Sequence, residues 1–232
     1  MSELLRISGL WGGYKEGVDI LRGIDMSVAE GEAVGIIGLN GSGKSTLGKA
    51  IMNMIPFRKG EILLGGEDIT PLPTYELAQR GISIMQQGGQ VFRNLSVWEN
   101  LQMAFGDKMD DGFGALQELI PMLRRPRKEL SRTMADRLSG GQRHQLSLAM
   151  ALATRPRLVI LDEPSAGLSP KAVEEMYGIL GAVREKMHVT ILLIEQNVAK
   201  AVGFCDRTLV MVLGQVMEST DVDDYERLLF NK

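Results

Sequence analysis

The sequence has little of several features that mark other classes of protein. Its 232 residues include one cysteine, Cys205, so no disulfide can form within the chain. The 26 basic and 29 acidic side chains nearly balance, leaving a formal net charge of −3. These values exclude a disulfide scaffold and a strongly basic nucleic-acid binder, and we expect no nucleic-acid partner. With 44% hydrophobic but only 5% aromatic residues, the chain can bury a core built mainly from aliphatic side chains.

Long apolar runs are missing as well. The longest, at 158–161 and 189–194, are far shorter than the roughly 20 residues needed to cross a bilayer. No charged and then apolar leader precedes Leu4. We therefore expect a protein of the reducing cytoplasm. If it works at a membrane, we expect a peripheral partner.

The pattern along the chain is typical of an α/β protein, because short aliphatic runs alternate with longer helical segments. Strands are expected at 4–7, 24–28 and 33–37, before any helix, which indicates an antiparallel β portion near the N-terminus. The helical pattern at 44–55 ends at Pro56 and Gly60, and a strand follows at 61–64.

A second region, residues 91–135, loses the strand signals and is predicted to be an inserted helical subdomain of a single domain, 1–232. Ser96 and Glu99 have the spacing of a capping box, and a second helix is expected at 112–125. The α/β pattern then returns. The expected helices are 139–154, 170–187, 198–205 and a short one at 225–230, and the expected strands are 158–161, 189–194, 209–213 and 215–217.

Residues 38–46 fit the phosphate-binding pattern G-x-x-x-x-G-K-[ST], with a strand before and a helix after. Its glycines let backbone N–H groups turn inward and cradle phosphate oxygens at a helix N-terminus. This context disfavours a glycine-rich turn with a chance lysine. Lys44 is expected on the β- and γ-phosphates and Ser45 on Mg²⁺. The expected nucleotide-binding residues here are Gly38, Asn40, Gly41, Ser42, Gly43, Lys44, Ser45 and Thr46.

The aliphatic strand at 158–161 runs directly into two carboxylates, Asp162 and Glu163. Ligands of parallel sheets bind at the carboxyl ends of strands. We therefore predict that Asp162 holds Mg²⁺ and that Glu163 acts as the general base on the attacking water. The alternative, an acidic pair that is plain surface charge, loses weight because of the phosphate loop upstream.

Residues 138–142 read Leu-Ser-Gly-Gly-Gln, and Ser139 and Gln142 again have capping-box spacing. Two exposed glycine amides, those of Gly140 and Gly141, would then stand at a helix N-terminus as a second anion site. The phosphate loop already wraps the phosphate chain of one nucleotide, so that nucleotide does not require a second anion site from the same monomer. This suggests a surface offered to another subunit.

The phosphate loop, Leu-Ser-Gly-Gly-Gln and Leu-Asp-Glu-Pro, in this order and spacing, resemble the ATP-binding cassette family over essentially the whole chain. The resemblance implies a P-loop NTPase core and the cofactors ATP and Mg²⁺. It also implies a head-to-tail dimer with a second ATPase subunit, identical or different, in which Ser139, Gly140, Gly141 and Gln142 act in trans. Transmembrane permease subunits and, indirectly, a solute-binding protein would be the other partners, at the cytoplasmic face of the inner membrane.

The resemblance assigns further positions. Tyr14 matches the aromatic residue that stacks on adenine, with Trp11 as a rival. Gln87 matches the glutamine that reaches Mg²⁺ and the water, and Gln86 beside it leaves that assignment open. Residues 165–168 resemble the loop that crosses between subunits.

One position departs from the family, because Gln196 stands where a histidine that contacts the γ-phosphate is usual. Glutamine can donate a hydrogen bond to a phosphate oxygen, but it does not titrate near pH 7. We therefore count Gln196 among the candidate catalytic residues for phosphate sensing, without an acid–base role. The two histidines, His144 and His188, are expected to be ordinary surface or helix-terminal residues.

The Glu-Gln-Asn string at 195–197 and the glycine-rich stretch at 88–92 look like an ATP-binding subunit of branched-chain amino-acid importers. Urea and short-amide importers have closely similar subunits and remain an alternative. A cassette that works on nucleic acid or ribosomes is disfavoured, because the chain has no coiled-coil insertion, no second cassette and no basic tract. A clamp that binds ATP without hydrolysing it is opposed by Glu163 and slightly favoured by Gln196.

Overall fold

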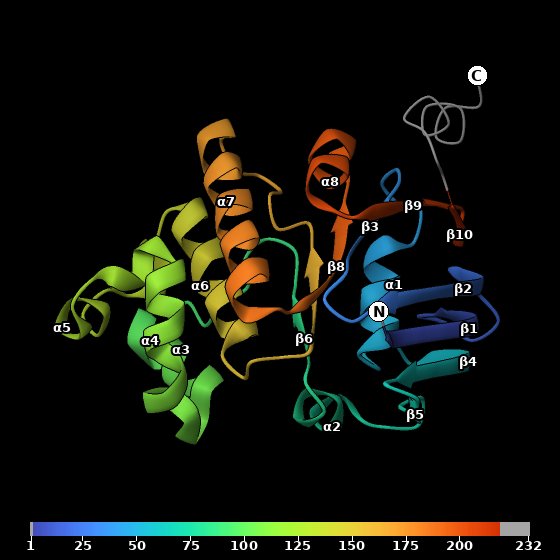
Figure 1. Ribbon diagram of the computed structural model, residues 1–232, viewed down its shortest axis with the longest axis horizontal. Helices are drawn as coiled ribbons and strands as arrows, with labels where there is room; N and C mark the ends of the chain where they lie inside the picture. The colour runs from blue at the N-terminus through green and yellow to red at the C-terminus, as the bar shows by residue number, and fades with distance from the viewer. Residues whose placement is uncertain (1, 219–232) are drawn as a thin grey trace.

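The computed structural model describes residues 2–218, whose strands form two sheets flanked by helices (Figure 1). The first sheet has the order β2-β1-β4-β5 and is antiparallel throughout. Its strands are β1 (Glu3–Gly13), β2 (Leu21–Ala29), β4 (Phe57–Leu64) and β5 (Glu67–Asp68).

The second sheet has the order β10-β9-β3-β8-β7-β6. Its pairs are parallel except for β9 with β10, which form a hairpin around Gly214. The strands are β3 (Ala33–Ile37), β6 (Ile82–Met85), β7 (Leu158–Asp162), β8 (Thr190–Glu195), β9 (Arg207–Val212) and β10 (Gln215–Glu218). The prediction that grouped residues 33–37 with the N-terminal antiparallel portion is wrong, because β3 pairs in parallel with β8 and β9.

The parallel sheet is buried on both faces, which explains its continuous aliphatic strands. In β8, Ile191 and Leu193 belong to one hydrophobic core, while Leu192 and Ile194 belong to the other. The first core reaches into the helical segment and the second packs against the antiparallel sheet. The carboxyl ends of these strands are therefore held rigidly from two sides.

Four principal helices accompany the strands: α1 (Lys44–Ile51), α6 (Gly140–Leu152), α7 (Pro170–Met187) and α8 (Val198–Phe204). The first ends four residues before the predicted position, because Asn53 takes a left-handed conformation with a φ of 52°. Ser169 caps α7 and Pro170 is its first residue, as expected. None of the helices within residues 2–218 is long and apolar enough to cross a membrane.

Between β6 and α6 the chain forms a set of helices and short 3₁₀ turns at one end of the molecule (Figure 1). An antiparallel bridge between Ser96 and Met134 joins the two ends of this segment. The predicted helix 112–125 is in fact two elements, because Pro121 begins a separate 3₁₀ turn. The elements are α3 (Val97–Phe105), η1 (Gly106–Lys108), α4 (Met109–Leu119), η2 (Pro121–Arg124), α5 (Arg127–Leu130) and η3 (Ala135–Arg137).

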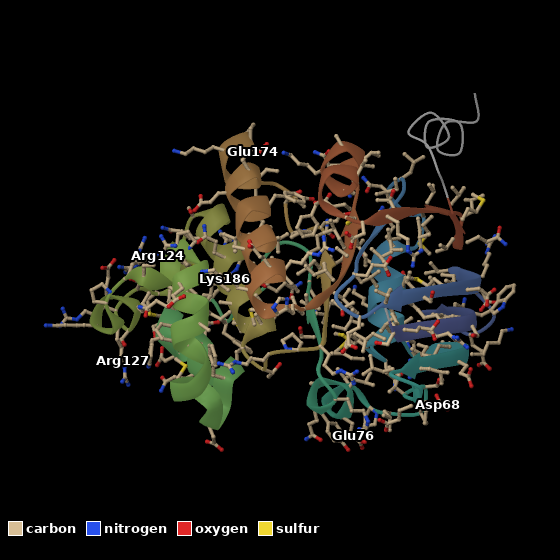
Figure 2. The ribbon with its side chains drawn as sticks, in the orientation of Figure 1. Asp68, Glu76, Arg124, Arg127, Glu174 and Lys186 are labelled. Carbon is tan, nitrogen blue, oxygen red and sulfur yellow. The ribbon has the colours of Figure 1, made fainter. Side chains whose placement is uncertain are left out.

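The basic run at 124–128 lies at the outer end of this segment, where Figure 2 shows Arg124 and Arg127. The Arg127 guanidinium lies 4.5 Å from the centre of the Trp98 ring, and Arg125 forms an ion pair with Glu129. Arg125 and Arg127 thus already contact other residues of their own helical segment. The helix α2 (Thr74–Gln79) was not predicted, and the helix expected at 225–230 lies outside the described residues.

Candidate functional site

The loop between β3 and α1 wraps around a buried lysine. The Nζ atom of Lys44 donates hydrogen bonds to the carbonyl oxygens of Gly38 at 2.8 Å and Leu39 at 3.0 Å. Burial lowers the pKa of Lys44, and the nearby carboxylate of Glu163 opposes that shift. The ammonium group is therefore placed at the centre of the loop and faces the acidic residues across it.

The glycines of the loop have distinct roles. Gly43 precedes α1 with a φ of 111°, a conformation that side chains disfavour, and it leaves the first helical N–H groups without a side-chain cap. A Cβ on Gly38 would lie 2.4 Å from the Met211 carbonyl oxygen, so this glycine permits close packing on β9. A Cβ on Gly41 would have no other atom within 4 Å, so Gly41 lies on the open side of the loop.

A hydroxyl and a carboxylate meet beside the loop. The Ser45 Oγ donates a hydrogen bond of 2.9 Å to the carboxylate of Asp162, the last residue of β7. Asp162 is 2% exposed, and burial raises its pKa, although the hydrogen bond from Ser45 opposes this. A hydroxyl and a carboxylate oxygen at this distance fit the hard oxygen ligands that Mg²⁺ prefers.

Glu163 receives hydrogen bonds from two glutamines on neighbouring strand ends. Gln87 Nε2 donates to one carboxylate oxygen at 2.6 Å, and Gln196 Nε2 donates to the other. The backbone N–H of Glu163 donates to the Ile194 carbonyl at 2.9 Å, and its φ is 49°. The side chain is buried, so its orientation is fixed by its neighbours rather than by solvent.

These groups share one cavity of about 280 Å³. The structure thus brings together the phosphate loop and the three predicted catalytic residues, although Asn40 and Gln196 are 156 positions apart in the sequence (196 − 40). Ile20 also lines this cavity, and no motif in the sequence pointed to it. The lining residues are Ile20, Asn40, Gly41, Gly43, Lys44, Ser45, Thr46, Gln87, Glu163 and Gln196.

The structure separates Gln87 from Gln86, whereas neither Tyr14 nor Trp11 is among the residues that line the cavity of the phosphate loop. Gln87 contacts Glu163, whereas Gln86 lines a different cavity on the side of α6. Tyr14 follows β1 with 47% of its surface exposed, and the Lys49 Nζ lies 6.0 Å from its ring centre. The Trp11 ring, in contrast, lies within β1 beneath the Lys59 ammonium at 4.9 Å.

The Leu-Ser-Gly-Gly-Gln segment forms the predicted capping box. Ser139 Oγ accepts from the Gln142 N–H at 3.2 Å, and Gln142 Oε1 accepts from the Ser139 N–H at 3.1 Å. Residues 139–142 line a second cavity of about 580 Å³, together with residues from η2 and the start of α7. The structure therefore does not bring this segment to the phosphate loop of the same chain.

The prediction for His144 is wrong, since it is 4% exposed and lies within α6. Its Nδ1 is 2.7 Å from the Pro164 carbonyl oxygen, and because a carbonyl only accepts, Nδ1 carries the proton. A Cβ on Gly89 would lie 2.5 Å from its ring. Burial lowers the pKa of His144. His188 is helix-terminal as predicted, because it ends α7 in a left-handed conformation.

A family model described as ABC transporter matches residues 21–166. The chain belongs to the ABC transporter family. It is an ATPase subunit of that family, in which hydrolysis of ATP is coupled to transport, and its α/β fold is the predicted P-loop NTPase fold. Cassettes of this family bind nucleotide, dimerise and work with transmembrane permease subunits.

Several characterised relatives align over most of the chain. A probable branched-chain amino acid transport ATP-binding protein, LivF of Archaeoglobus fulgidus, is 37% identical, covering 92% of this chain and 90% of that protein. The high-affinity branched-chain amino acid transport protein BraG of Pseudomonas aeruginosa is 34% identical, covering 88% and 87%. The lipopolysaccharide export protein LptB of Acidithiobacillus ferridurans is 33% identical, covering 94% and 90%.

Solved structures agree with the fold. A nucleotide-free ATP-binding cassette from an ABC transporter superposes with a TM-score of 0.83 at 26% identity, covering 97% of this chain and 94% of the other. The ADP conformation of the cassette MJ1267 gives 0.83 at 27% identity, covering 99% and 95%.

Proposed function

We propose that this ABC transporter ATPase energises the uptake of branched-chain amino acids. The proposal is supported by its similarity to LivF and BraG and by the Glu-Gln-Asn string at 195–197. An importer of urea or short amides is the alternative, since its ATPase subunits are closely similar. The similarity to LptB makes lipopolysaccharide export a third outcome to be tested.

In the proposed site, the phosphate loop holds the phosphates of ATP. Its backbone N–H groups and Lys44 would contact phosphate oxygens, and Tyr14 would stack on the adenine ring. Ser45, Asp162 and Gln87 would hold Mg²⁺, which neutralises phosphate charge when bound. The complete proposed set for the nucleotide is Tyr14, Gly38, Asn40, Gly41, Ser42, Gly43, Lys44, Ser45 and Thr46 from one subunit, with Ser139, Gly140, Gly141 and Gln142 from the other.

Glu163 would act as the general base. A positioned carboxylate accepts the proton that the attacking water loses, which commonly contributes 10²–10⁴-fold to a rate. The amides of Gln87 and Gln196 donate hydrogen bonds to that carboxylate, and Gln196 would also donate to the γ-phosphate. Because glutamine does not titrate near pH 7, Gln196 would sense phosphate without transferring a proton.

The two separate cavities favour a head-to-tail dimer. Ser139 and its neighbours would complete the site of a second ATPase subunit, and that subunit would complete this one. The helical residues 91–135 would transmit closure to permease subunits at the cytoplasmic face of the membrane, where a solute-binding protein delivers cargo from the other side.

The main observation in support of the proposed ATPase site is the contact of Glu163 with Gln87 and Gln196 beside the phosphate loop. Replacing Glu163→Gln keeps the shape and removes the base. We expect ATP binding to stay within about threefold of wild type while turnover falls by about 10²-fold or more. ATP-induced dimers should accumulate, as measured by gel filtration.

The matched control is Lys44→Ala, which should lose ATP binding itself because it removes the cation at the centre of the loop. A Glu163→Gln protein that hydrolyses ATP at the wild-type rate would remove Glu163 from the base role.

The cargo is tested separately. The tagged chain is purified with its native membrane partners, and the ATPase rate is measured with each solute and its binding protein. Leucine, isoleucine or valine should stimulate turnover severalfold. Stimulation by urea would change the cargo and keep the mechanism, whereas copurification with lipopolysaccharide export components would contradict import.

A further inference from the structure

A second buried carboxylate lies beside the site and has no role in the mechanism above. Glu195 is the last residue of β8, is 3% exposed and directly precedes Gln196. Its carboxylate accepts four hydrogen bonds, all from neutral donors. The sequence signal that pointed to Asp162, an acidic residue at the end of a buried aliphatic strand, applies equally to Glu195 and was not used for it.

The two oxygens of this carboxylate bind different segments. Oε1 accepts from Ser165 Oγ at 2.5 Å and from the Tyr177 hydroxyl at 3.0 Å. Oε2 accepts from the backbone N–H groups of Gln196 at 2.9 Å and Asn197 at 3.2 Å. One side of Glu195 thus binds the loop after Glu163, and the other fixes the chain that carries the Gln196 amide.

The residues that bind Glu195 are connected to both the cavity of residues 139–142 and the Glu163 carboxylate. Ser165 is two residues after Glu163, and its loop continues to Gly167 and Leu168, which line the cavity of residues 139–142. Gln196 donates to the Glu163 carboxylate. One carboxylate is therefore hydrogen-bonded both to the 165–168 loop and to the backbone of Gln196.

Tyr177 holds this carboxylate from α7. Its ring packs edge-on against Phe204 of α8, with the ring centres 5.7 Å apart. Burial and the Glu195 carboxylate raise the pKa of the Tyr177 hydroxyl well above its usual value, so it remains a donor at any physiological pH. A buried polar group costs free energy unless it is hydrogen-bonded, and the Glu195 side chain accepts four hydrogen bonds.

We propose that Glu195 is a positioning residue that couples the 165–168 loop to Gln196, so that contact with a second subunit aligns the hydrolytic groups around Glu163. The proposal rests on the proposed roles of Glu163 and Gln196. It deepens them by naming the connection between the subunit interface and the reacting end of the site.

The experiment measures kcat and KM for ATP, together with thermal unfolding, in the full chain. Ser165→Ala and Glu195→Gln should each lower kcat about tenfold, the size expected for one lost hydrogen bond to a charged group, with KM changed less than about twofold. The double variant should be no slower than the slower single variant, because both changes break the same connection. Ser165→Thr keeps a hydroxyl and should recover at least half of the wild-type kcat.

Tyr75→Phe is the matched control for Tyr177→Phe. Tyr75 lies on α2 with 66% of its surface exposed, so removing its hydroxyl should leave kcat unchanged, while Tyr177→Phe lowers it. Effects of Ser165→Ala and Glu195→Gln that multiply in the double variant, or a KM that rises in step with the loss of kcat, would overturn the coupling. If Glu163→Gln abolishes turnover and the Ser165 and Glu195 variants do not slow it, this inference fails while the proposed function stands.

Discussion

At the end of β7 two adjacent carboxylates have different surroundings. Asp162 is buried beside a hydroxyl, whereas Glu163 is oriented by two carboxamides. This difference matches the division of labour expected from the sequence, one acid for metal charge and one for proton transfer. Burial also disfavours the charged form of the Asp162 carboxyl and raises its pKa.

The burial of Asp162 leads to a prediction about stability. Its pKa is raised in the folded state, so the unfolded chain gives up that proton more readily, and the native state loses stability as the pH rises through the raised pKa. Asp162→Asn keeps an acceptor for Ser45 and removes the charge. We expect its Tm at pH 7.5, without nucleotide, to exceed that of wild type by roughly 2–4 °C.

The same comparison at acid pH is the control. The difference in Tm should shrink as the pH falls toward the ordinary range of carboxyl groups, measured by calorimetry. A variant that melts below wild type at pH 7.5 would show that the ionised Asp162 stabilises the folded chain.

Residues with a strong local pattern could be predicted from the sequence. The phosphate loop and the acidic pair each follow a recognisable strand, whereas Gln196 is assigned by the resemblance to the ATP-binding cassette family. Ile20, Glu195 and the burial of His144 were missed, because their positions depend on contacts between distant segments. His144 packs against Gly89 and Pro164, and no spacing in the sequence brings those together.

At the scale of elements, two helices begin with the same device. Ser96 starts α3 and Ser139 starts α6, each with a complete capping box. Ser96 is 3% exposed, whereas Ser139 is exposed and faces the second cavity. Loss of either cap should therefore lower the free energy of unfolding by a similar amount. The effect on the ATPase rate should differ between the two.

This pair gives a matched test. Each replacement by alanine should destabilise the chain by about 1 kcal/mol, because one orphan backbone N–H loses its acceptor. Ser96→Ala should keep the ATPase rate of the assembled transporter within about twofold, whereas Ser139→Ala should lower it about tenfold. Equal loss of activity in both, measured beside their Tm values, would mean that the serine at 139 serves α6 alone.

Element boundaries were predicted less well than element types. The aliphatic run at 33–37 does form a strand, but its neighbours, β8 and β9, lie more than 150 residues later in the sequence. The break near Ile120 depends on Pro121, a signal that was present but outweighed by the helical periodicity around it. Local pattern thus predicted the strand and helix types, and long-range pairing decided their arrangement.

For the whole molecule, the two cavities define two separate surfaces. One contains the phosphate loop and Glu163, and the other contains residues 139–142. A monomer with this arrangement can bind nucleotide with the first surface without using the second.

A bulky, positively charged side chain on the second surface should separate nucleotide binding from dimer formation. Ser139→Arg should leave ATP binding by isolated monomers within about twofold of wild type. In the Glu163→Gln background it should abolish the ATP-induced dimer seen by gel filtration, because the side chain fills the contact surface. Weaker ATP binding by the monomer would instead place residues 139–142 at the site of their own chain.

The strand order β3-β8-β7-β6 has a consequence for how such chains diversify. The phosphate loop, Gln196, Glu163 and Gln87 follow these four strands, so each neighbour along the sheet edge contributes one group to the site. The helical residues 91–135 begin after Gln87 and end before Ser139, and the bridge between Ser96 and Met134 brings the two ends of this segment together. Exchanging residues 91–135 between related transporters should therefore change which permease subunit the ATPase contacts, while Gln87, residues 139–142 and the hydrolytic edge of the sheet stay in place.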